Sequence, residues 1–174
     1  MSSPSRTRIL LIGVGNPLRG DDAAGALVAK LIRDRNCPSF CVVEQNGEGI
    51  SLMEAWASEQ RVIVVDAVSS DFSPGTIFRF EVTQEPLRGD LFRNSTHAFG
   101  LPEAVELSRA LDRLPHQLVI YGIQAKSFEI GTALSDEVET AAREVARRIL
   151  KEPELLQDKA NPTLDRDRRP HGNA

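Results

Sequence analysis

The sequence has little of what marks a secreted or membrane protein. Only two of its 174 residues are cysteines. These two, Cys37 and Cys41, have a spacing that matches neither a CxxC metal pair nor a secreted disulfide framework. The apolar run at 9–12 is much shorter than the ~20 residues that cross a membrane, and the short polar segment before it does not resemble a signal peptide. We therefore expect a cytoplasmic protein with reduced thiols and no membrane insertion.

Basic charge is also scarce, since 21 Lys and Arg face 25 Asp and Glu and the net charge is -4. Non-specific nucleic-acid binders usually carry a basic face, so we expect a protein or small-molecule partner and no nucleic acid. The 41% apolar content is enough to fill one core at this length. We predict a single domain over residues 1–151 and a flexible polar C-terminal tail over 152–174, where the apolar periodicity ends.

Strand patterns and helix patterns alternate along the chain. The runs at 9–12 and 61–67 are continuously apolar, which is typical of parallel strands covered on both faces. The stretch 76–82 alternates between apolar and polar residues, which indicates an antiparallel edge strand with one wet face. The alternation predicts an α/β fold with three α/β/α layers, a mostly parallel twisted sheet and helices on both faces. The expected strands are 9–12, 40–44, 61–67, 76–82 and 117–123, and the expected helices are 22–35, 50–58, 101–114 and 136–150.

A glycine turn at 13–17 follows the first strand and leads to two adjacent acids, Asp21 and Asp22. Glycine suits such a reversal because it reaches positive φ without steric cost. A dinucleotide fingerprint would need glycine where Leu18 stands, and the acids would repel a pyrophosphate. The chain also lacks the Gly-Lys-Ser/Thr of a P-loop, a G-x-S-x-G elbow and a Cys-His signature. Nucleotide-phosphate binding and nucleophilic hydrolysis of these types are therefore excluded.

Further polar residues stand where ligands bind in open α/β sheets, beyond the carboxyl ends of the strands. Asp66 ends the third strand and His97 precedes the third helix. Together with Asp21 or Asp22 they form an O, O, N set that can hold a borderline divalent ion with open positions. Each residue also has a structural explanation. An Asp can cap the first helix, Asp66 can accept from loop N–H groups, and His97 can be satisfied by backbone groups.

Several motifs in order resemble the hydrogenase maturation endopeptidases, from about residue 9 to 150. They are Ile12-Gly13-Val14-Gly15-Asn16-Pro17, then Gly20-Asp21-Asp22-x-x-Gly25, Val62-Ile63-Val64-Val65-Asp66-Ala67-Val68, Pro74-Gly75-Thr76, Ser95-Thr96-His97 and Gly122-Ile123-Gln124. Enzymes of that family remove a short C-terminal extension from the precursor of the nickel-iron hydrogenase large subunit after nickel insertion. The resemblance also implies a five-stranded sheet between helices, similar to phosphorylase/hydrolase-like folds.

By motif position, the resemblance implies that Asp22, Asp66 and His97 are both the catalytic residues and the metal ligands. Asp21 is left as a partner of the helix start. In the family, nickel is thought to be presented by the precursor instead of being a permanent cofactor, which agrees with a site of three side-chain ligands and open positions. Two departures from many relatives are Ala23, where glycine is common, and Gln124, where Glu is common.

No residue looks like an activated nucleophile, so we predict attack by water in a monomeric endopeptidase. Nickel held by the three ligands can polarise the scissile carbonyl and lower the pKa of water. Alternatively the ion only positions the substrate, and Asp22 or Asp66 is the general base. A second hypothesis is a non-catalytic nickel-sensing or precursor-binding protein with the same ligands. A third is a peptidyl-tRNA hydrolase, which shares the Gly-x-Gly-Asn-Pro turn, although the acidic charge is poor for tRNA.

Overall fold

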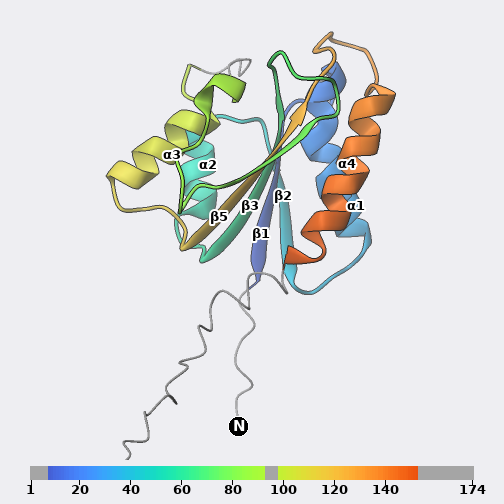
Figure 1. Ribbon diagram of the computed structural model, residues 1–174. Helices are drawn as coiled ribbons and strands as arrows, with labels where there is room; N and C mark the ends of the chain where they lie inside the picture. The colour runs from blue at the N-terminus through green and yellow to red at the C-terminus, as the bar shows by residue number, and fades with distance from the viewer. Residues whose placement is uncertain (1–7, 93–97, 153–174) are drawn as a thin grey trace, which may run out of the picture.

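The computed structural model describes residues 8–92 and 98–152 and has one five-stranded sheet (Figure 1). The strand order is β2-β1-β3-β5-β4, and the first four of these strands run parallel. β4 pairs antiparallel with β5 at the edge, as its alternating pattern predicts. The strands are β1 (Ile9–Val14), β2 (Phe40–Gln45), β3 (Arg61–Val68), β4 (Ile77–Glu81) and β5 (Gln117–Gln124).

Helices cover both faces of the sheet, which confirms the three-layer α/β/α architecture (Figure 1). α1 (Ala24–Asp34) and α4 (Asp136–Ile149) pack together on one face. α2 (Gly49–Trp56) and α3 (Leu101–Ala110) pack together on the other. Two short 3-10 helices, η1 (Gly20–Ala23) and η2 (Gly89–Phe92), lie in the connections.

The core consists of two apolar layers, one on each face of the sheet. Successive side chains of a strand point to opposite faces. Ile9 and Leu11 of β1 therefore belong to the layer under α1 and α4, whereas Leu10 and Ile12 belong to the layer under α2 and α3. All four are buried, which explains why the run is apolar without alternation.

Several helix ends differ from the sequence-based expectation, by up to four residues. α1 begins at Ala24 and not at residue 22, because residues 20–23 form η1 instead. α3 ends at Ala110 and not at 114, and the backbone then turns at Asp112, which has a positive φ of 54°. The polar connection after β4 also holds the turn η2, whose Leu91 and Phe92 are buried in the core. Helical periodicity alone does not mark such short turns.

The first residue of the expected polar tail packs into the domain. Glu152 is 1% exposed and accepts hydrogen bonds from the Tyr121 hydroxyl at 2.6 Å and from Arg79 Nε at 2.9 Å. Two partners on β4 and β5 thus satisfy this polar side chain within the folded part of the chain, while the expected domain boundary stays a prediction. Residues 153–174 lie outside the described part of the chain. No helix within the described residues has the length and apolar character needed to span a membrane.

Candidate active site

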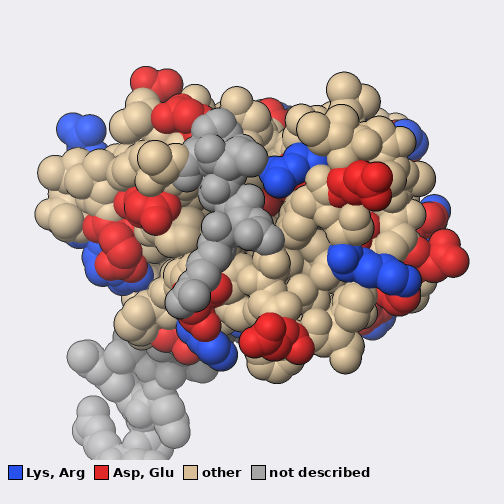
Figure 2. Space-filling model, turned by 90° about the horizontal axis from the view of Figure 1, so that it is seen from above, with Lys and Arg blue, Asp and Glu red and all other residues tan. Residues whose placement is uncertain are grey.

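The candidate site lies at the sheet edge where β1, β3 and β5 end, the face seen in Figure 2. Asp22 follows β1 within η1, and η1 packs against β3. Asp66 lies near the end of β3, in register with Gly122 of β5. The fold therefore brings together the two carboxylates that the sequence places 44 positions apart in the chain.

The glycine turn passes close to the Asp22 backbone and donates one hydrogen bond to its carboxylate. Gly15 has a φ of 130°, and a Cβ on it would lie 2.0 Å from the backbone oxygen of Asp22. The backbone N–H of Asn16 also donates to the Asp22 carboxylate at 2.8 Å. Both contacts require a tight reversal directly after β1, which glycine permits at this φ. The turn thus sets the position of the Asp22 backbone and of one carboxylate oxygen.

Asp66 is half-buried and responds to the charge of Asp22. Burial, followed by the negative charge of Asp22, raises the pKa of Asp66 to about 7, while the backbone N–H of Ala67 acts in the opposite direction. Two carboxylates that repel each other in a desolvated setting are stabilised by a cation between them. This pair can therefore provide the oxygen ligands of a divalent-ion site.

Asp21 has a different role from the helix-start partner expected from the sequence. Its buried carboxylate accepts from the backbone N–H groups of Lys126 at 2.7 Å, Ser127 at 3.0 Å and Ser135 at 2.7 Å. Burial favours the neutral form, but these N–H groups and the Ser135 hydroxyl hold the pKa of Asp21 below its usual value. Asp21 therefore joins η1 to the loop between β5 and α4, whereas Asp22 is left beside Asp66.

His97 lies outside the described residues, so its place relative to the two carboxylates stays a prediction. Within the described ranges, no group of three His, Cys, Asp or Glu side chains is arranged to hold a metal ion. The chain soon after His97 is anchored, because the N–H of Gly49 donates to the Phe99 carbonyl at 2.9 Å. This contact connects the segment before α3 to the first turn of α2.

Gln124 stabilises the loop that follows Asp66, a role that the sequence motif alone did not reveal. Its buried side chain accepts from the Ser70 hydroxyl at 2.6 Å and donates to the carbonyls of Ser70 and Ala125. An amide provides both the donor and the acceptor that these partners require. An ionised Glu has no N–H to donate, so Gln suits these partners where the family resemblance leads us to expect Glu.

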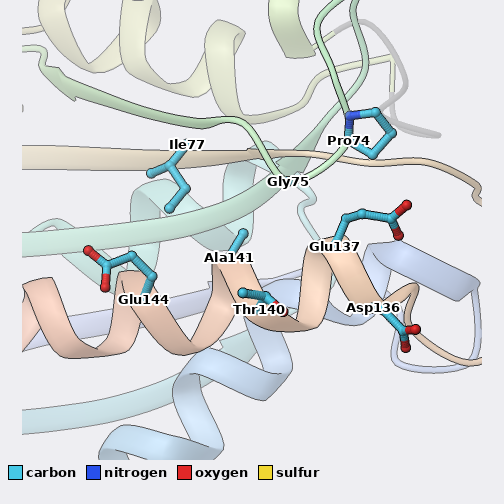
Figure 3. A pocket seen from close by; sticks show the side chains of 8 residues that line it. All are labelled: Pro74, Gly75, Ile77, Asp136, Glu137, Thr140, Ala141 and Glu144. Atoms are coloured by element: carbon cyan, nitrogen blue, oxygen red, sulfur yellow. The ribbon is translucent and has the colours of Figure 1, made fainter.

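A groove of about 450 Å³ lies between the start of β4 and α4 (Figure 3). Its lining includes neither Asp22 nor Asp66. Two of its acidic residues are paired, Glu137 with Lys126 at 2.9 Å and Glu144 with Arg147 at 2.8 Å. The groove is therefore separate from the candidate site, and the basic partners of these two acids lie outside its lining.

The family model for hydrogenase maturation proteases matches residues 26–152. The chain belongs to the hydrogenase maturation protease family. It is 32% identical to a putative hydrogenase maturation protease of Methanocaldococcus jannaschii, over 83% of this chain and 95% of the relative. It is also 29% identical to the hydrogenase 2 maturation protease of Escherichia coli, over 82% of this chain and 88% of the relative.

Solved structures agree with this hydrogenase maturation protease assignment. The maturation protease HybD of Thermococcus kodakarensis superposes with a TM-score of 0.65 at 27% identity, covering 84% of this chain and 99% of that one. HybD of E. coli has a TM-score of 0.70 at 23% identity, covering 87% and 93%, and supports the fold alone. The expected family, fold and endopeptidase class are thereby confirmed.

The family assignment establishes the general activity of this protease. Hydrogenase maturation proteases cleave the C-terminal extension from the nickel-iron hydrogenase large subunit. The family is nickel-dependent, and its substrate is the large-subunit precursor. The matches therefore favour an endopeptidase over a peptidyl-tRNA hydrolase or a binding protein without activity.

Proposed function

We propose that Asp22, Asp66 and His97 form the site at which this maturation protease engages the nickel-loaded precursor and cleaves its extension. The observation that carries the proposal is that Asp22 lies beside Asp66. Each of the two carboxylates is positioned by its own part of the fold. Asp22 is held by the 2.8 Å hydrogen bond from Asn16, and Asp66 belongs to a central strand of the sheet. Both carboxylates thus have a defined position before substrate arrives, which favours catalysis.

The nickel belongs to the substrate in this proposal. Two carboxylates and one imidazole leave coordination positions open for ligands from the precursor. The protease then recognises the loaded precursor through its ion, and the scissile peptide is brought next to Asp22 and Asp66. Water is the nucleophile, and one carboxylate of the pair accepts its proton. The proposal includes a cytoplasmic location and a monomeric enzyme, as expected from the sequence.

The test compares the wild type with Asp22→Asn, Asp66→Asn and His97→Ala on nickel-loaded large-subunit precursors encoded by the same genome. Mass spectrometry measures the loss of the extension. Each variant should lose cleavage by about 10² to 10⁴-fold, because a positioned proton acceptor or ligand is removed. Asp34→Asn is the matched control, since Asp34 lies at the far end of α1 and pairs with exposed Lys30. Cleavage at the wild-type rate by both Asp variants would refute the proposed site.

A further inference from the structure

Exposed apolar side chains gather on the same sheet edge as Asp22 and Asp66. Within residues 8–92 and 98–152, five large apolar side chains are at least half exposed: Leu18, Ile50, Phe72, Leu111 and Ile130. All except Leu111 stand in the segments that directly follow the carboxyl ends of β1, β2, β3 and β5. Figure 2 shows uncharged surface between separated acidic and basic groups on this face. Exposed apolar side chains that lie next to one another can mark a contact surface, whereas isolated ones do not.

The two most exposed of these side chains belong to one structural unit. Leu18 is 72% exposed and Ile130 is 80% exposed. The backbone N–H of Gly131 donates to the Leu18 carbonyl at 2.9 Å, so the loop after β1 and the loop after β5 lie side by side. We call these two loops, residues 16–19 and 127–132, the apolar ridge.

Contacts of Gly20 and Asp21 with the loop after β5 hold the apolar ridge in place. Gly20 has a φ of 53°, and a Cβ there would lie 2.8 Å from the Ser127 carbonyl, so the loops approach closely. The Asp21 N–H donates to that same carbonyl at 2.9 Å, while the Asp21 carboxylate accepts from three N–H groups of the loop after β5. The Arg19 guanidinium also lies 5.4 Å from the centre of the Phe128 ring. A surface that is already rigid loses little conformational entropy when a partner binds to it.

We propose that Leu18 and Ile130 dock the folded body of the hydrogenase large-subunit precursor. This inference rests on the proposed function, because the loop at 16–19 leads directly to Asp22 and its Asn16 N–H donates to the Asp22 carboxylate at 2.8 Å. The ridge presents its side chains outward, which suits insertion into pockets of a folded partner. An extended peptide such as the extension would instead need a groove or a free strand edge. The occupant is therefore the body of the precursor.

The experiment measures steady-state cleavage of a nickel-loaded precursor by Leu18→Ser, Ile130→Ser and the double variant. Each single variant should raise KM about tenfold and the double variant about a hundredfold, with kcat within about twofold of the wild type. Leu111→Ser is the matched control, because Leu111 is 51% exposed but follows α3, away from the strands' carboxyl ends. Its KM should equal that of the wild type. Melting temperatures should also match, since all three side chains are exposed.

Product inhibition identifies which part of the precursor covers the ridge. The mature large subunit lacks the extension, so its inhibition constant should rise in the double variant by the same factor as KM. A rise in KM without a rise in this inhibition constant would place the extension on the ridge and overturn the proposal. An unchanged KM in an active double variant would overturn it while leaving the catalytic assignment intact. A wild type that cleaves no precursor would overturn both.

Discussion

At the residue scale, adjacent acids in one motif have separate tasks. The sequence places both at the carboxyl end of the first strand but gives no sign of the partners of Asp21, which are 105 to 114 positions away. Asp21 fastens the loop after β5, and this frees Asp22 to stand beside Asp66. The position of Asp66 could be predicted because its strand ends in a carboxylate after a buried apolar run. Long-range hydrogen bonds have no comparable local pattern.

The glycine turn makes a sharp prediction about Asp22. Gly15→Ala would place a Cβ 2.0 Å from the Asp22 backbone oxygen at a φ of 130°. The turn must shift to relieve this overlap, so cleavage of the precursor should fall at least about tenfold, and the free energy of unfolding should fall by about 1–3 kcal/mol. Activity assays and chemical denaturation measure both effects. Gly89→Ala is the control, since its Cβ would make an ordinary 3.6 Å contact. Wild-type activity in Gly15→Ala would contradict the role of the glycine turn in positioning Asp22.

At the element scale, local sequence patterns predicted much of the fold. Runs of buried residues identified the parallel strands, and alternation identified β4 as the antiparallel edge. The patterns failed where long-range contacts decide the structure. η1 interrupts the expected start of α1, and Glu152 is buried although its neighbourhood is polar. Its partners, Tyr121 and Arg79, belong to strands that are 31 and 73 positions away in the sequence, so the local pattern around Glu152 does not reveal them.

The buried hydrogen bond from Tyr121 of β5 to Glu152, which follows α4, predicts a pH-dependent stability. Burial, the hydrogen bond to Glu152 and that residue's charge raise the pKa of Tyr121 above its usual value of 10.0. The neutral phenol therefore stabilises the fold fully below pH 10, and this contribution is lost as pH rises toward the folded-state pKa. Tyr121→Phe should destabilise the protein by about 1–3 kcal/mol at pH 7. The gap between variant and wild type should narrow above pH 10 in thermal melts. A gap that is constant with pH would contradict this account.

At the scale of the whole molecule, the protease carries two carboxylates and several exposed apolar side chains at the same edge of its sheet. Its described residues provide two of the three proposed ligands, and His97 lies outside them. In the site proposed above, an ion held by three side chains would need further ligands from the partner. Cleavage should therefore depend on which protein carries the nickel, and this dependence separates a substrate-borne ion from a resident cofactor.

Removal of nickel from each partner in turn tests that dependence. The wild-type protease should not measurably cleave nickel-free precursor. Incubating the protease with nickel and then desalting it should not change this result, because an incomplete ligand set releases the ion. Precursor that is loaded with nickel and then desalted should be cleaved by protease treated with a chelator and desalted. Mass spectrometry of the large subunit measures both reactions, and metal analysis after desalting measures which protein retains nickel. Cleavage of nickel-free precursor by nickel-treated protease would show that the ion resides in the enzyme, and the three-residue site would then need further protein ligands.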